Sequence, residues 1–303
     1  MKKKSTLLIN IEYLIVLFLI KFISLFPYKI ASDIGGSIGR LGYYIDGKHR
    51  NITLNNLTMA FPEKGKREII FIARKAFENL GRSVAEVIYI TNRKTDDLKK
   101  VLYEWITVEG RDNLDHAIKK GKGILLLTAH FGNWELLGLT AATHGYKLNV
   151  IARPLDNPKL DTFINSLRSI TGTNVYPKKG VLKDILKSLK QGEGVGILID
   201  QNTSRSEGVF VDFFGRPAST NRGPAVIAMK SETPVVPFFI IRENKYRHRI
   251  VYCEDMPLHR SGDKEKDAVL NTEMFTKKVE SFIRNYPEQW FWMHQRWKTK
   301  PLQ

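Results

Sequence analysis

The stretch "ILLLTAHFGNWELLG" contains a histidine and a glutamate whose types and spacing suit acid–base chemistry. His130 directly follows a run of strand-forming residues, and Glu135 stands five positions later. Residues five apart do not share one face of a helix, where neighbours are three or four apart. We therefore expect His130 in the loop before a helix and Glu135 in its first turn, where the helix dipole favours a carboxylate. Glu135 would then hold one imidazole nitrogen and leave the other to take a proton from a hydroxyl.

The residues around this pair narrow the chemistry further. Asn133 is a candidate contact for the substrate or an oxyanion, and it is a suitable N-cap for a helix that begins at Trp134, after a turn that Gly132 permits. No serine or cysteine nucleophile accompanies the pair, so direct transfer to a bound alcohol is favoured over a covalent intermediate. The alternative is a structural His130 that caps a helix or satisfies a hydrogen bond in the core. A metal site is disfavoured, because no His-Glu-x-x-His occurs and the single cysteine, Cys253, rules out a zinc site built from cysteines.

The elements that must position these residues indicate an α/β fold. Residues 28–105 carry apolar side chains at helical spacing, and short apolar runs alternate with helices over residues 106–303. Continuous Val, Ile and Leu runs joined by helices predict a mostly parallel mixed sheet flanked by helices, within one domain of residues 28–303. The predicted strands cover residues 123–128, 148–153, 174–176, 195–200, 235–242 and, as a hairpin return, 249–254. The predicted helices among them cover residues 134–143, 158–170, 181–190, 223–230 and 264–285.

Two charged residues end predicted strands of this sheet, where open α/β sheets collect their ligands. Arg153 is expected to face the same crevice as His130 and to stabilise an oxyanion or hold a phosphate, with an ion pair to Asp156 as the alternative. Asp200 could hold Arg153, orient His130 or bind an acceptor hydroxyl, and the sequence does not choose among these roles.

The net charge indicates a polyanionic partner. Lys and Arg total 48 against 31 acidic residues, a formal net charge of +17. Such a field favours anionic membranes, phosphorylated lipids, acidic proteins or nucleic acid. Arg205 and Arg222, in the loop after Asp200, are candidate headgroup contacts, with solvated cations as the alternative. Nucleic acid is disfavoured, because the aromatic and basic tail "EQWFWMHQRWKTKP" follows a hydrophobic N-terminus and an enzyme-like core.

The N-terminal segment, residues 1–27, predicts association with a membrane. Three lysines precede an apolar run from Leu7 to Phe26, which Glu12 and Lys21 interrupt. Small residues typical of a signal-peptide cleavage site are missing. The run could span the bilayer with a cytoplasmic N-terminus, lie in the interface, or pack on the main domain. An interfacial helix is easiest to reconcile with a catalytic domain that faces the cytoplasm.

Five blocks of the sequence resemble the bacterial lipid A biosynthesis (late) acyltransferase family, within the glycerolipid acyltransferase superfamily. "AHFGNWELLG" is similar to the His-x4-Asp/Glu block of that family. The later blocks follow in the same order: "IARPLDNPKLD", "GILIDQN" with "VFVDFFGRPASTNRGPA", "TPVVPFF" and "YPEQWFWMHQRWKT". The family often has Asp-His-Asp where this chain has Asp200-Gln201-Asn202, which removes the second acidic position but not Asp200.

The resemblance implies an O-acyltransferase in which His130 and Glu135 are the catalytic pair. It implies acyl carrier protein as the donor, a phosphorylated, sugar-based lipid A precursor as the acceptor, and the bacterial inner membrane as the location. No metal or diffusible cofactor is needed for this chemistry. Alternatives are an acyltransferase for another membrane glycolipid or lysophospholipid, a scaffold that binds anionic membranes without catalysis, and a hydrolase that releases the free acid.

Overall fold

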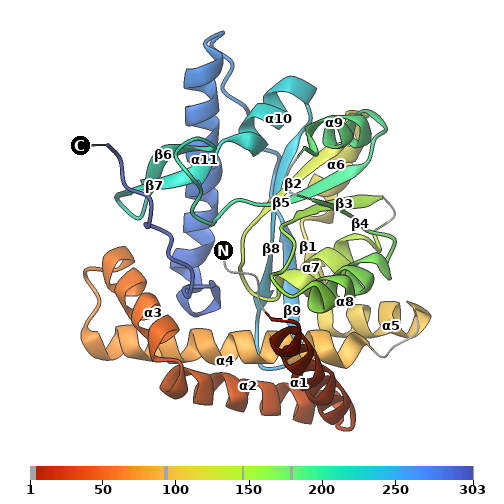
Figure 1. Ribbon diagram of the computed structural model, residues 1–303. Coiled ribbons are helices and arrows are strands. Elements are labelled where there is room, and N and C mark those ends of the chain that lie inside the picture. The colour runs from red at the N-terminus through yellow and green to blue at the C-terminus, as the bar shows by residue number, and fades with distance from the viewer. Residues whose placement is uncertain (1–4, 92–94, 145–146, 178–179, 303) are drawn as a thin grey trace.

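The computed structural model describes residues 5–91, 95–144, 147–177 and 180–302, and begins with a helical portion (Figure 1). In the described residues, five helices come before the first strand in sequence: α1 (Thr6–Ser24), α2 (Tyr28–Ile45), α3 (Gly47–Ala60), α4 (Lys66–Thr91) and α5 (Thr95–Trp105). The long helix α4 runs below the sheet in Figure 1, with α2 against it and α1 beside α8. The predicted helical portion before the sheet is therefore confirmed in the described residues.

A seven-stranded, mostly parallel sheet forms the centre of the molecule, with the strand order β1-β9-β8-β2-β5-β3-β4. Only the β8–β9 pair is antiparallel within this sheet, as the hairpin return predicted for residues 249–254 requires. The strands are β1 (Ile106–Glu109), β2 (Ile124–Thr128), β3 (Leu148–Ala152), β4 (Asn174–Pro177), β5 (Gly194–Leu198), β8 (Val235–Arg242) and β9 (His248–Tyr252). A separate hairpin consists of β6 (Gly208–Phe213) and β7 (Arg216–Asn221).

Helices cover both faces of the sheet, so the central strands are apolar on both sides. They are α6 (Arg111–Lys119), α7 (Trp134–Ala141), α8 (Pro158–Ser169), α9 (Leu182–Lys190), α10 (Gly223–Ser231) and α11 (Lys264–Asn285), followed by the short helix η1 (Pro287–Gln289). In β2, Leu125 and Leu127 pack towards α9, α10 and α11, whereas Leu126 packs towards α5, α6 and α7. All three leucines are fully buried, and each burial contributes about 1.5–3 kcal/mol to folding.

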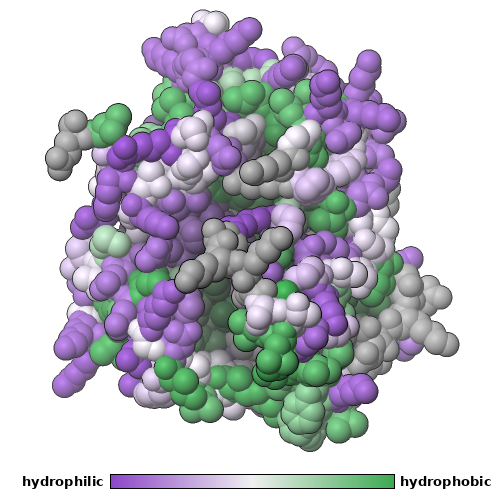
Figure 2. Space-filling view, viewed as in Figure 1, coloured by the Kyte–Doolittle hydropathy of each residue, from purple (hydrophilic) through white to green (hydrophobic). Residues whose placement is uncertain are grey.

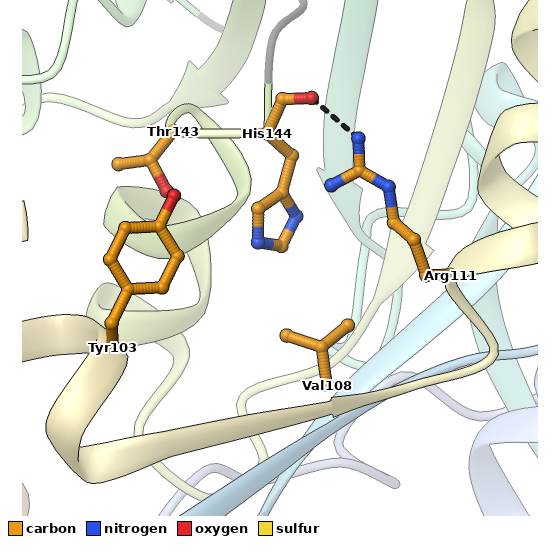
Figure 3. A pocket seen from close by; sticks show the side chains of 5 residues that line it. All are labelled: Tyr103, Val108, Arg111, Thr143 and His144. Carbon is orange, nitrogen blue, oxygen red and sulfur yellow. Dashed lines mark hydrogen bonds between the residues drawn. The ribbon is translucent and has the colours of Figure 1, made fainter.

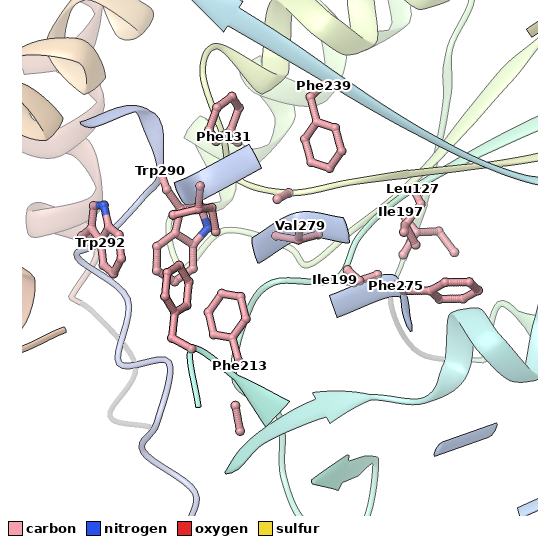
Figure 4. Close-up of a cluster of buried hydrophobic side chains, with 14 of the residues drawn as sticks. Leu127, Phe131, Ile197, Ile199, Phe213, Phe239, Phe275, Val279, Trp290 and Trp292 are labelled. Carbon is pink, nitrogen blue, oxygen red and sulfur yellow. The ribbon is translucent and has the colours of Figure 1, made fainter. Parts of the chain in front are cut away.

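The larger of the two cores also encloses the C-terminal tail. Trp290, Trp292 and Trp297 are buried together with Phe213 of β6. Figure 4 shows three of these side chains, those of Trp290, Trp292 and Phe213. Lys298 and Lys300 are exposed. The tail therefore packs its tryptophans and leaves these two lysines at the surface, and it fastens the β6–β7 hairpin to the body of the protein.

The contact between α2 and α4 is unusually close because glycines line it. A Cβ atom added at Gly35 would lie 2.4 Å from the Cβ of Ala85, and one at Gly39 would lie 2.2 Å from the carbonyl oxygen of Phe77. On the α4 side, a Cβ at Gly81 would lie 2.2 Å from the oxygen of Gly35. Small residues spaced four apart let two helix backbones approach in this way. The inner face of α2 is therefore packed closely against α4.

The structure confirms the predicted fold class and adds elements that the sequence pattern did not indicate. Helix α6, strand β1 and the β6–β7 hairpin were not predicted, because their segments are short and lack a clear apolar period. The division into a membrane segment of residues 1–27 and one domain of residues 28–303 stays a prediction, and residues 1–4 lie outside the described part of the chain.

Candidate active site

His130 lies in a short loop that leaves the carboxyl end of β2 and is fixed by the C-terminal tail. The backbone N–H of Gly132 donates to the carbonyl oxygen of Gln289 at 2.8 Å, and the N–H of Phe291 donates to that of His130 at 3.0 Å. Gly132 has a φ of +59°, and a Cβ there would lie 2.0 Å from the oxygen of Ile240. The loop therefore needs glycine at this position, and the tail forms one of its walls.

The imidazole of His130 is held by Asp200, which comes from the neighbouring parallel strand. Nδ1 of His130 lies 2.9 Å from Oδ1 of Asp200, and the backbone N–H of His130 donates to Oδ2 at 3.0 Å. The indole N–H of Trp290 donates to the same Oδ2 at 2.7 Å. Because β2 and β5 are adjacent and parallel, their carboxyl ends bring these residues together from 70 positions apart.

The electrostatics of this cluster favour an ionised Asp200. Burial alone would raise the pKa of this carboxyl group, but the charge and hydrogen bonds of His130, together with the bond from Trp290, lower the pKa below its ordinary value. An ionised acceptor at Nδ1 keeps the proton on that nitrogen, so the lone pair of Nε2 is available as a base. A carboxylate in this position can also stabilise an imidazolium.

The Nε2 side of the ring faces the open part of the site. The amide nitrogen of Gln201 lies 3.3 Å from Nε2, which matches an amide donor and a ring acceptor. The rings of Trp134 and Phe291 flank the imidazole at centroid distances of 5.2 and 6.3 Å. The His130 side chain is 23% exposed, whereas that of Asp200 is 2% exposed. The imidazole of His130 is thus accessible from solvent, and the carboxylate that holds it is not.

Glu135 does not contact His130 in the way that the sequence predicted. Its carboxylate accepts two hydrogen bonds from Arg168 of α8, at 3.0 Å from Nε and 2.6 Å from the terminal nitrogen. Both side chains are mostly buried. The prediction of Glu135 in the first turn of α7 was right, but that turn faces α8, and Asp200 already occupies Nδ1. The orienting contact is therefore corrected from Glu135 to Asp200, one of the three roles left open for Asp200.

The predicted N-cap, Asn133, holds the His130 loop through hydrogen bonds of its side chain. Its side-chain oxygen accepts from the N–H of Leu136, as a cap does, and its amide donates to Glu86 at 2.9 Å. Glu86 is fully buried and is paired with Arg242 of β8. Burial would raise the pKa of Glu86, but the charge of Arg242 and the nearby His248 outweigh it and lower the pKa strongly. Asn133 is itself buried, so it links the His130 loop to a buried ion pair.

The three arginines predicted as substrate contacts have other partners in the structure. Arg153 is exposed and faces Asp156 at 3.6 Å, which is the ion pair weighed as the alternative to a site contact. Arg205 donates to the carbonyl oxygen of Lys300 at 2.9 and 2.6 Å. Arg222 is paired with Glu265.

Two residues that hold the predicted site residues Asp200 and Glu135 were missed from the sequence. Trp290 donates to Asp200, and its place in an aromatic-rich tail was the only available signal. Arg168 lies in an ordinary amphipathic helix, and nothing in its local sequence marks it. Both contacts depend on how distant segments pack, which a linear pattern does not contain.

A separate hollow lies away from this cluster. It is lined by Tyr103, Val108, Arg111, Thr143 and His144, between α5, β1 and the end of α7 (Figure 3). Arg111 donates there to the carbonyl oxygen of His144 at 2.7 Å. Within the described residues, no group of three or more His, Cys, Asp and Glu side chains is arranged to hold a metal ion.

Comparison with known proteins adds an independent result. The family model "Bacterial lipid A biosynthesis acyltransferase" matches residues 1–299. The lipid A biosynthesis lauroyltransferase of Escherichia coli K12 is 28% identical over 277 residues, which cover 91% of this chain and 87% of that protein. The palmitoleoyltransferase of the same organism is 24% identical over 278 residues, with the same coverage. A lipid A biosynthesis acyltransferase of Haemophilus influenzae is 26% identical over 281 residues, which cover 91% and 86%.

Proposed function

Since the chain belongs to the bacterial lipid A biosynthesis acyltransferase family, we propose that it transfers a fatty acyl chain from a thioester to a hydroxyl group of a lipid A precursor, with His130 as the general base. The observation that carries this proposal is the pairing of His130 with the buried Asp200 at the carboxyl edge of the sheet. The relatives support the substrate class, because they are named as lauroyl- and palmitoleoyltransferases of lipid A biosynthesis.

The proposed reaction is a direct transfer in which His130 passes the proton of the acceptor hydroxyl to the leaving thiolate and is itself left unchanged. The acceptor hydroxyl displaces the Gln201 amide from Nε2 of His130 and gives its proton to that nitrogen as its oxygen attacks the thioester carbonyl carbon. The tetrahedral intermediate then re-forms the carbonyl and breaks the carbon–sulfur bond. The departing thiolate takes the proton from the imidazolium, which Asp200 stabilises while the ring is charged. The products are an ester and a free thiol.

Further residues complete the proposed site. Arg153, at the end of β3, exchanges its contact with Asp156 for the negative charge of the acceptor or of the oxyanion. Glu135 and Arg168 act as a pair that holds α7 against α8, so Glu135 is a positioning residue. No step in the proposed reaction falls to Arg205 or Arg222.

The proposed donor is acyl carrier protein, and the proposed location is the cytoplasmic face of the inner membrane. The net charge of +17 supports both, since an acidic carrier protein, a phosphorylated glycolipid and an anionic bilayer are all attracted to a basic protein. The helix α1 is long and apolar enough to cross a membrane. The reaction as written requires no metal and no diffusible cofactor.

The proposal is tested by mixing the purified protein with a lipid A precursor and with acyl carrier protein that carries a radiolabelled acyl chain. We expect one labelled ester product, lost in His130→Ala. Lipid A from cells with and without the gene should differ in mass by an acyl chain. An unchanged lipid A mass, with the label found instead in another glycolipid or a lysophospholipid, would overturn the acceptor. Release of free fatty acid in the presence of acceptor would indicate a hydrolase.

A further inference from the structure

Helix α2 presents a stripe of aliphatic side chains to solvent. Ile30, Ile38, Leu41 and Ile45 are 48–74% exposed, and their spacing places them on one side of the helix. The opposite side is packed on α4 through glycines, so the stripe cannot turn inward. Soluble proteins rarely expose large contiguous apolar surfaces unless something binds there.

The apolar stripe of α2 continues into a second one on α1. Along α1 and the residue after it, the exposed apolar side chains again fall on one side of the helix. They are Leu7, Leu8, Ile11, Leu14, Ile15, Phe18, Phe22 and Leu25. Figure 2 shows hydrophobic residues gathered along the lower edge of the molecule, where Figure 1 places α1 and α2. We call these two stripes together the α1–α2 face.

Helix α1 is fastened to the enzyme at both ends. Near its start, the amide of Asn157, the N-cap of α8, donates to the carbonyl oxygen of Ile9 at 2.9 Å and to the carboxylate of Glu12 at 3.0 Å. Near its end, Ile20 and Ile23 are buried in a small cluster with α2 and α4. Hence α1 is part of the folded body: its inner side contacts α2, α4 and α8, and its outer side is apolar and exposed.

We propose that α1 and α2 lie together in the plane of an anionic bilayer, with the α1–α2 face buried among the acyl chains. Exposed cations accompany the two stripes: Lys21 on α1, Lys29 and Arg40 on α2, and Lys48 just beyond it. Their stems can lie along apolar surface while their charges reach lipid phosphates. A bilayer fits this combination of apolar stripe and basic flank better than a second copy of the chain, which would bring the same positive charges together.

A spanning orientation of α1 conflicts with its contacts. If α1 crossed the hydrocarbon region while docked, the N-terminus of α8 would enter with it, including Glu12's partner Asn157 and the cation of Lys159, which lies 5.5 Å from the ring of Tyr13. Charged groups in the hydrocarbon region are costly. The in-plane orientation keeps all these groups at the protein side of the interface.

The α1–α2 face is connected to the helix that follows the His130 loop. Helix α8 contacts α1 through Asn157 and contacts α7 through Arg168 and Glu135, directly after the His130 loop. The inference rests on the proposed membrane location but not on the proposed chemistry, so an inactive His130→Ala protein should bind vesicles as the native protein does.

Vesicle binding of the full chain tests the proposal. Sedimentation with vesicles of phosphatidylethanolamine and phosphatidylglycerol should show at least a tenfold weaker partition for Ile38→Glu/Ile45→Glu, because two side chains lose their apolar burial and two negative charges face anionic lipid. The matched control is Leu182→Glu/Leu302→Glu, which adds the same charge at exposed leucines of α9 and the tail. It should change the partition less than twofold. Circular dichroism and thermal unfolding establish that all variants are folded.

Depth measurements separate the in-plane from the spanning orientation. In a Cys253→Ser background, a fluorophore on a cysteine at position 7, 14, 25 or 38 should be quenched to a similar, shallow depth by brominated lipids. Maximal depth at position 14 with shallow positions 7 and 25 would overturn the in-plane orientation. Unchanged vesicle binding of the α2 variant would overturn the role of α2. A dimer that dissociates in this variant, with lipid binding intact, would assign the face to a second copy instead.

Discussion

Replacing Asp200 with asparagine should inactivate the enzyme, because it would favour the wrong tautomer of His130, the proposed base. The carboxylate accepts three hydrogen bonds: two at Oδ2, from the His130 backbone and Trp290, and one at Oδ1, from Nδ1. An amide has only one acceptor oxygen. If that oxygen stays at the Oδ2 position, it keeps two bonds, and the NH2 group faces Nδ1. The imidazole must then carry its proton on Nε2, where the acceptor hydroxyl needs a lone pair.

The expected decrease in kcat follows from two losses: the tautomer that leaves Nε2 unprotonated, and the negative charge beside the imidazole. In a Ser-His-Asp triad the same replacement costs about 10⁴-fold in kcat. For Asp200→Asn we expect a decrease of about 10³–10⁴-fold, or about 4–5.5 kcal/mol in the activation barrier. Stability should fall by only about 1–2 kcal/mol, because two of the three bonds remain. Initial rates of label transfer and chemical unfolding give the two quantities.

The Glu135→Gln variant shows whether Asp200 or Glu135 is the acidic residue that orients His130. This variant should lose about 1–2 kcal/mol of stability, because Arg168 keeps only a neutral acceptor in a mostly buried place. Its rate should fall far less than that of Asp200→Asn. A folded Asp200→Asn protein within tenfold of the native rate, or a Glu135→Gln protein equally inactive and fully stable, would refute the assignment of Asp200 as the orienting group.

Three further outcomes follow from the structure. Gly132→Ala should lower the free energy of unfolding by about 2 kcal/mol or more, measured by denaturant unfolding, because its Cβ would meet a backbone oxygen at 2.0 Å. Gly138→Ala is the matched control, because open space surrounds Gly138, and it should be neutral or stabilising. Glu86→Gln should cost about 3–5 kcal/mol at pH 7, because Arg242 is left buried without a counter-charge. His144, whose pKa burial lowers from 6.5 to about 4, should make the native protein lose about 2 kcal/mol more than His144→Gln between pH 7 and 4.5.

The signs of the pH effects come from the direction of each shift. The folded protein holds His144 neutral, so the unfolded chain takes up a proton first as the pH falls below 6.5, and stability is lost in that window. For Glu86 the pKa is lowered from 4.5, so its contribution is present above pH 4.5 and is lost on further acidification. Equal pH slopes for native protein and His144→Gln, or full stability of Glu86→Gln, would contradict these assignments.

The local part of the site was predictable, and the part that depends on strand order was not. The apolar run before His130, the permissive Gly132 and the cap at Asn133 are adjacent in sequence, so their structure follows from local rules. Asp200 was recognised at the end of a strand, but its choice of partner depends on β5 lying next to β2. No local pattern specifies that neighbour. Glu135 was assigned to His130 from its place in the first turn of the following helix and from the His-x4-Asp/Glu block, whereas its actual partner, Arg168, is 33 residues away.

Pairing between the His130 loop and residues 289–291 has a consequence for biosynthesis. A ribosome adds those residues almost 160 positions after it has made His130, as the numbering shows. Until they emerge, the loop lacks its wall and Asp200 lacks the indole donor. If the first helices bind lipid as proposed, the nascent chain would reach the membrane before its site is complete, and the proposed acyl transfer would begin only when the tail has packed against the loop.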